Sequence, residues 1–217
     1  AGMSRNSYNR DHWKKKITSY LAEDWSRQAS PFVQLSEPYF KRGAKVLELG
    51  TGAGQDGVWL EEQGFKVILS DGDDTAFDQV QQTSRYNTRP IKFDLTERFP
   101  FETASFDAVY AQLVLHYFDD ETMHKIMNEI KRVLVDDGIL SFMVNTVLDP
   151  EYKDTPNDGT GIIQTAKLTK RYFSKESLAP FVKDFEPLLF DENGRTPKDD
   201  AVSNSGMIQF IGRVKHG

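Results

Sequence analysis

The stretch that decides the fold is Val46–Gly57, VLELGTGAGQDG, in which an apolar strand pattern runs into a glycine cluster and then into a helix. The loop carries Gly50, Gly52 and Gly54. Such a loop lets backbone approach a ligand closely, because glycine has no side chain and accepts positive φ angles. The stretch therefore predicts a ligand site at the end of the first strand.

Two ligand-binding patterns fit this stretch. Gly52-x-Gly54-x-x-Gly57 satisfies the dinucleotide fingerprint, and Glu48-x-Gly50-x-Gly52-x-Gly54 satisfies the pattern of S-adenosylmethionine binders. An ordinary glycine-rich strand-to-helix turn is the third interpretation. A dinucleotide places its pyrophosphate against the helix N-terminus and gains nothing from a nearby anion. Glu48 therefore favours a cationic ligand such as S-adenosylmethionine, which has an ammonium and a sulfonium but no phosphate.

Strand and helix patterns alternate on the C-terminal side of this stretch. The clearest helix is expected over 120–135, where apolar residues form one stripe, and Gly138 is expected to stop it. A further helix is expected over 75–86, and strands are expected over 45–49, 66–70, 91–93, 106–111 and 139–144. This alternation predicts an open parallel sheet with right-handed crossovers.

The two ends of the chain extend this core. Residues 9–42 show helical periodicity and form an N-terminal helical cap, while 149–170 is polar. Ser174 is expected to cap a helix through Lys183, and 185–190 and 207–214 are expected to pair as an antiparallel hairpin at or near a sheet edge. The predicted fold is α/β, Rossmann-like and doubly wound, with a mostly parallel seven-stranded sheet, an antiparallel C-terminal strand and N-terminal lid helices.

We expect one domain over 1–217, with a cofactor-binding core at 43–145 and a substrate-side insertion and C-terminal hairpin at 146–217. Ala1-Gly2, ahead of Met3, is interpreted as a tag remnant. The net charge of −6 argues against a duplex nucleic acid partner held by phosphate neutralisation. The absence of cysteine and of a long apolar run favours the cytoplasm and predicts no membrane span. We expect no metal.

Asp71 is the second candidate ligand residue. It ends the second strand, where a carboxylate can accept hydrogen bonds from two ribose hydroxyls. Solvation or helix capping is an equal alternative for this residue, and the neighbouring Asp73 and Asp74 are candidate caps for the next helix.

From Gly43 to Asn145 the chain resembles the class I S-adenosylmethionine-dependent methyltransferases in the order and spacing of these motifs. The resemblance implies that the methionine end lies against Glu48, Gly50, Thr51, Gly52 and Gly54, the ribose against Asp71 and Gly72, the adenine against Asp94 and Leu95, and the sulfonium above Ala111, Gln112 and Leu113. Asp136-Asp137-Gly138 replaces the family's usual Pro-Gly-Gly before the fifth strand, which removes no implied contact. The core and Tyr172-Phe173-Ser174 look closest to the small tellurite-resistance type.

The resemblance implies in-line methyl transfer to an acceptor that the sequence does not identify; we expect a small molecule. His116 and Tyr117 are expected at the mouth of the pocket, with His116 either a base or a packed side chain. Tyr8 and Trp13 are candidate acceptor-side residues, with helix packing as the alternative. An NAD-dependent oxidoreductase and a non-catalytic S-adenosylmethionine-binding protein remain the rival functions, and the chain can be a monomer or a homodimer.

Overall fold

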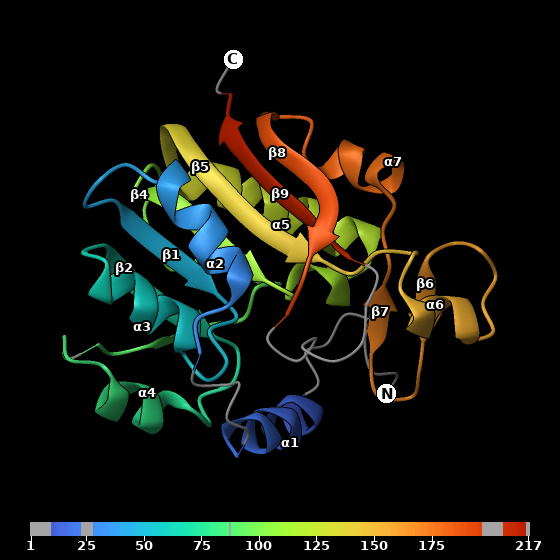
Figure 1. Ribbon diagram of the computed structural model, residues 1–217, viewed down its shortest axis with the longest axis horizontal. Helices are drawn as coiled ribbons and strands as arrows, with labels where there is room; N and C mark the ends of the chain where they lie inside the picture. The colour runs from blue at the N-terminus through green and yellow to red at the C-terminus, as the bar shows by residue number, and fades with distance from the viewer. Residues whose placement is uncertain (1–9, 23–27, 87, 197–205, 216–217) are drawn as a thin grey trace.

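A seven-stranded sheet with helices on both faces forms the centre of the molecule (Figure 1). The computed structural model describes residues 10–22, 28–86, 88–196 and 206–215. In spatial order the strands are β3 (Ile91–Lys92), β2 (Lys66–Asp71), β1 (Lys45–Leu49), β4 (Phe106–Gln112), β5 (Leu134–Val144), β9 (Met207–Val214) and β8 (Phe185–Gly194). The first five are mutually parallel, and β9 is antiparallel to both of its neighbours. The predicted fold class and the antiparallel hairpin at one edge are confirmed.

The strand order reverses between β1 and β4, and this reversal positions the site. In open α/β sheets, ligands bind at the carboxyl ends of the strands where the order reverses. The arrowheads of β1 and β5 point toward α1 (Arg10–Leu21), which lies beyond this edge of the sheet (Figure 1).

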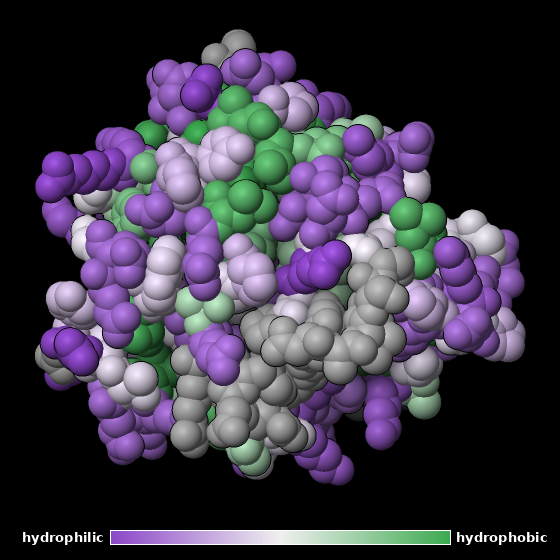
Figure 2. Space-filling view, viewed as in Figure 1, coloured by the Kyte–Doolittle hydropathy of each residue, from purple (hydrophilic) through white to green (hydrophobic). Residues whose placement is uncertain are grey.

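Two helical layers bury the sheet. One face packs against α2 (Pro31–Ser36) and α3 (Gln55–Glu62), and the opposite face packs against α5 (Asp120–Val133) and the turn η4 (Ala179–Phe181). The helix α4 (Phe77–Thr83), shorter than the expected 75–86, packs through Val80 in a smaller cluster beside β2. On the face shown in Figure 2, hydrophilic side chains surround apolar groups that gather beside α2 and along β8 and β9.

Helix α5 shows why the sequence prediction was right about the helix and wrong about its end. Asp119 caps it by accepting a hydrogen bond from the Thr122 amide at 2.9 Å, and its apolar stripe is buried. The helix ends at Val133, because Leu134 turns to extended backbone and pairs with Phe106 of β4. The expected end at Val135 is therefore wrong, since β5 begins before Gly138.

Residues 149–170, expected only as a polar insertion, contain α6 (Pro150–Asp154) and most of a two-stranded sheet, β6 (Ile162–Gln164) and β7 (Thr169–Arg171). Arg171 fastens this unit to the core, because its guanidinium pairs with Asp120 and lies 4.6 Å from the centre of the Phe173 ring. Contacts distant in sequence therefore hold these short elements in place.

The helix expected from Ser174 through Lys183 is only α7 (Lys175–Leu178), followed by η4. Ser174 caps it as predicted, accepting a hydrogen bond from the Ser177 amide at 3.0 Å. The helix stops early because Pro180 has no amide hydrogen to continue the ladder. Within the described residues, the helices are too short or too polar to cross a bilayer.

Candidate functional site

In the glycine loop after β1, the backbone is open to a ligand at one residue, Gly52. Gly50, Gly52 and Gly54 have φ angles of +68°, +56° and +85°. A Cβ added at Gly50 would lie 2.2 Å from a Val114 methyl, and one at Gly54 would lie 2.6 Å from a Val80 methyl. A Cβ at Gly52 would have no heavy atom within 4 Å. Gly50 and Gly54 thus permit close packing, and Gly52 faces open space.

Hydrogen bonds fix this loop to the ends of β1 and β2. The Thr51 hydroxyl donates to Glu48 Oε1 at 2.7 Å and accepts from the Ser70 amide at 3.0 Å. The Gly52 amide donates to Asp71 Oδ2 at 2.9 Å, and Asp71 Oδ1 accepts from the Asp73 amide at 3.0 Å. Asp71 is therefore held at the open side of the loop, whereas Glu48, 3% exposed, lies beneath it.

Three carboxylates surround the loop: Glu48, Asp56 and Asp71. Burial raises the pKa of each, and the nearby Asp56 carboxylate adds to the increase in the pKa of Glu48, which stands well above its usual value. No Lys or Arg in the described ranges forms an ion pair with any of the three. A cationic ligand would favour the ionised form of these carboxyls, so the crevice is suited to a cation.

The remaining predicted cofactor residues lie at the carboxyl edge of the same sheet. Asp94 follows β3 and accepts hydrogen bonds from the Thr96 amide at 2.8 Å and hydroxyl at 2.7 Å, while Leu95 packs against the core. Ala111 and Gln112 end β4. Leu113 adopts a φ of +57°, and its amide donates to the Met143 carbonyl at 2.9 Å. A bulky residue in this conformation is rare and costs about 1–2 kcal/mol.

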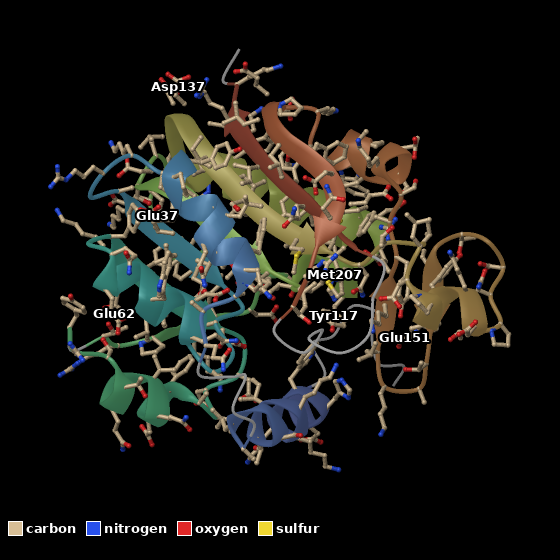
Figure 3. The ribbon with its side chains drawn as sticks, in the orientation of Figure 1. Glu37, Glu62, Tyr117, Asp137, Glu151 and Met207 are labelled. Atoms are coloured by element: carbon tan, nitrogen blue, oxygen red, sulfur yellow. The ribbon has the colours of Figure 1, made fainter. Side chains whose placement is uncertain are left out.

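The acceptor-side candidates meet at the turn η3 (Leu115–Tyr117). The Tyr117 ring centre lies 4.3 Å from that of His116 and 4.6 Å from that of Trp13 on α1. Tyr117 and Met207, both labelled in Figure 3, lie at the carboxyl edge of the sheet. The fourth candidate, Tyr8, lies outside the described residues. Trp13, His116 and Tyr117 are therefore brought together.

His116 is buried and not at the mouth where it was expected. It is 1% exposed, and its Nδ1 has no hydrogen-bond partner. Burial lowers the pKa of His116 well below its usual value, and the positive charges of Lys170 and Lys16 lower it further. The imidazole is therefore neutral at pH 7 and is a weaker base than an exposed histidine.

A buried polar cluster behind the loop was missed by the sequence analysis. The Asp56 carboxylate accepts hydrogen bonds from the Ser30 amide at 2.7 Å, the Ser30 hydroxyl at 2.8 Å and the Tyr110 hydroxyl at 2.6 Å. The contacts join residues far apart in sequence, so no local pattern indicated them. Asn145, just past β5, was also missed; it is 5% exposed, and its Nδ2 has no partner.

The buried Glu48 carboxyl predicts a measurable pH dependence of stability. Because its pKa in the folded protein lies above the unfolded value, its contribution is full below that unfolded value, near 4.5, and is lost as pH rises through the folded value. Glu48→Gln keeps an oxygen for Thr51 and cannot ionise, so its Tm should fall less than that of the wild type as pH rises. Thermal denaturation from pH 4 to 8 measures this difference, with exposed Glu62→Gln as the control; parallel curves for all three proteins would contradict it.

Comparison with known proteins extends these observations. The family model described as "Methyltransferase domain" matches residues 46–138. The chain is 29% identical over 103 residues to an uncharacterized methyltransferase of Synechocystis, covering 46% of this chain and 47% of the relative. It is 29% identical over 150 residues to a glycine/sarcosine N-methyltransferase of Aphanothece halophytica, covering 60% and 54%. The chain thus spans about half the length of these curated relatives.

A solved structure resembles nearly the whole fold. It is the 1,6-didemethyltoxoflavin-N1-methyltransferase of Burkholderia thailandensis, with a TM-score of 0.70, 19% identity, and coverage of 99% of this chain and 93% of that one. The match extends beyond the core that the family model covers, so the flanking elements also follow this fold. Residues 46–138 therefore match a methyltransferase domain, and nearly the whole chain shares the fold of a solved methyltransferase, in agreement with the resemblance that the order of its motifs indicated.

Proposed function

We propose that this protein binds S-adenosylmethionine at the glycine loop and transfers its methyl group to a small-molecule acceptor. The observation that carries the proposal is the open backbone at Gly52 beside three carboxyl groups, of which Glu48 and Asp56 are buried and Asp71 is partly buried, and none of which pairs with a described Lys or Arg. A ligand with an ammonium and a sulfonium supplies the missing positive charge and has no phosphate for the carboxylates to repel.

The residues fit this cofactor along the whole carboxyl edge. The amino-acid end would lie against Gly52, where a Cβ would meet no protein atom, and Asp71 would accept hydrogen bonds from the ribose hydroxyls. Each Asp71 oxygen accepts one backbone amide, which holds the carboxylate rigid and leaves lone pairs for the ribose. Asp94 and Leu95 would meet the adenine, and Leu113 would lie beneath the sulfonium.

When bound, the cofactor supplies an electrophilic methyl group. The protein's contribution is to orient the acceptor and to exclude water, effects that can reach about 7–11 kcal/mol. Trp13 on α1 contacts Tyr117 of η3, and β7 also lies against η3, so these elements would cover an acceptor bound beside η3. An acceptor site covered in this way would suit a small molecule better than a macromolecule. His116, neutral and with no partner for its Nδ1, is the candidate to accept a proton from an acceptor that must lose one.

Calorimetry against S-adenosylmethionine, S-adenosylhomocysteine and NAD tests the cofactor assignment. We expect both sulfur-containing nucleosides to bind and NAD to bind at least about 100-fold more weakly, because its pyrophosphate would face the carboxylates. Tight NAD binding with no response to the other two would overturn the proposal and favour an oxidoreductase.

The acceptor class needs a separate test, since other relatives are named for tRNA and for ribosomal protein L11. S-adenosylhomocysteine release is measured after adding the low-molecular-weight fraction of a cell extract, total tRNA, or a ribosomal protein fraction. Release with the first fraction alone is expected. Release only with tRNA or protein would overturn the small-molecule assignment, and a folded, cofactor-binding protein that is silent with all three would favour a binding protein.

Asp71→Ala should weaken S-adenosylhomocysteine binding by at least about tenfold, or 1.4 kcal/mol, because the ribose loses its acceptor. The substitution also removes the acceptor of the Gly52 amide. Asp71→Asn keeps one acceptor oxygen, so comparing the two variants distinguishes the role of Asp71 in holding the loop from its role in binding the ribose. Exposed Asp74→Ala, three residues away, is the control, and calorimetry supplies the affinities. Unchanged affinity in a folded Asp71→Ala variant would remove Asp71 from the site.

A further inference from the structure

The buried cluster behind the glycine loop reaches the cofactor crevice through one side chain, Gln112. Tyr110 Oη lies 2.6 Å from Asp56 Oδ2 and 3.1 Å from the Gln112 side-chain oxygen. Ser30 caps α2 and bonds Asp56, which lies in the first turn of α3. The cluster therefore joins α2, α3 and the end of β4.

Counting protons fixes the orientation of the Gln112 amide. The Tyr110 hydroxyl has one proton, and the closer and more basic acceptor for it is the Asp56 carboxylate. The Ser30 hydroxyl proton also goes to Asp56 Oδ2, at 2.8 Å. With the Asp56 carboxyl ionised, neither hydroxyl has a proton left for Gln112, so a hydrogen bond between Gln112 and Tyr110 requires Gln112 to donate. Because the amide nitrogen and oxygen have nearly the same shape, the hydrogen-bond network decides between them.

We therefore exchange the positions of the Gln112 amide nitrogen and oxygen. In this orientation Nε2 donates a hydrogen bond to Tyr110 Oη, and Oε1 points away from the cluster. Strand register shows where this side chain lies. Glu48 pairs with Tyr110 and Leu49 with Ala111, so Gln112 is level with Gly50, the first residue of the loop. Side chains alternate along β4, which puts Gln112 on the face shared by Tyr110 and Glu48. The Gln112 side chain is thus at the ends of β1 and β4, beside the glycine loop.

We infer that Asp56 and Tyr110 are positioning residues that lock Gln112 with its amide oxygen toward the amino-acid end of the cofactor, where it accepts a hydrogen bond from the ammonium. The inference rests on the proposed function. It gives the buried cluster a role in ligand selectivity: the opposite amide orientation would present hydrogens to a cation. A ligand that lacks the ammonium gains nothing from the lock.

Tyr110→Phe tests the lock, because it keeps the ring stacked on Phe32, 5.7 Å between centres, and removes only the hydroxyl. Affinities for S-adenosylhomocysteine and for 5′-methylthioadenosine, which has no amino-acid end, are measured by calorimetry. We expect S-adenosylhomocysteine to bind about ten- to hundredfold more weakly and methylthioadenosine to bind unchanged. Gln112→Ala should give the same split, and the double variant should lose no more than either single one.

Tyr39→Phe, at a partly exposed site in the turn η2 (Glu37–Tyr39), is the matched control and should bind both ligands as the wild type does. Equal weakening of both ligands in Tyr110→Phe would mean general damage to the loop and would overturn the inference, as would unchanged affinity for both. If Tyr110→Phe fails to fold, Gln112→Ala at the strand end decides alone. A wild-type protein that binds neither ligand would instead refute the proposed function.

Discussion

Gly52→Ala is expected to raise the Kd for S-adenosylhomocysteine by at least about 100-fold in a protein that still folds. Gly52 has a φ of +56°, and a Cβ there would meet no protein atom within 4 Å. The substitution therefore costs only backbone strain of about 1–2 kcal/mol in the free protein. The added methyl group instead occupies the space that the cofactor needs for close approach to the backbone.

Gly43→Ala is the control that distinguishes backbone strain from steric blocking of the cofactor. Gly43 has a φ of +71°, a Cβ there would also meet no atom within 4 Å, and it lies before β1, at the opposite end of that strand from the loop. Both variants should show similar losses in Tm, and only Gly52→Ala should lose ligand in calorimetry. Equal binding by the two variants would place the cofactor away from the glycine loop.

Asp56→Ala is expected to lower the free energy of unfolding by about 3–5 kcal/mol, the largest stability effect in this set. The change leaves three buried donors without their acceptor: the Ser30 amide, the Ser30 hydroxyl and the Tyr110 hydroxyl. Each unsatisfied buried donor costs about 1–3 kcal/mol, and the loss of the carboxylate's own burial cost offsets part of the sum. Chemical denaturation measures the difference, and Tm should fall by about 10 °C.

Asp78→Ala is the matched control for this stability measurement. Asp78 lies in the first turn of α4 as Asp56 lies in the first turn of α3, but it is exposed. It should lose only the favourable interaction of a carboxylate with a helix N-terminus, about 0.3–1 kcal/mol. A loss of that size in both variants would show that the buried cluster adds little to stability.

The sheet was largely predictable because its strands carry local signals. The strand β1 and the last strand, Met207–Val214, have the expected bounds, since each is an apolar or alternating run bounded by glycine or polar residues. The unit at 149–171 was not predictable, because α6, β6 and β7 are short and depend on contacts such as Arg171 with Asp120. Such pairings leave no periodic pattern in the sequence.

The site divides in the same way. The glycine loop and Asp71 follow from their place at strand ends, where local sequence determines the backbone. The position of Glu48 beneath Thr51 and the burial of His116 depend on what packs over them. The bonds of Asp56 to Ser30 and Tyr110 connect α2, α3 and β4, so only the assembled fold reveals them. These are also the residues on which the selectivity inference depends.

The place of β9 has a consequence for how the chain reaches its native state. Since β9 lies between β5 and β8 but follows β8 in the sequence, β8 can join the sheet only through residues 207–214, which pair with both β5 and β8. Until these residues pair, the backbone amides and carbonyls of β5 remain available to strands of other molecules, which promotes aggregation. Completion of the sheet should therefore be a late and slow event, and brief protection by a chaperone should raise the yield of folded protein.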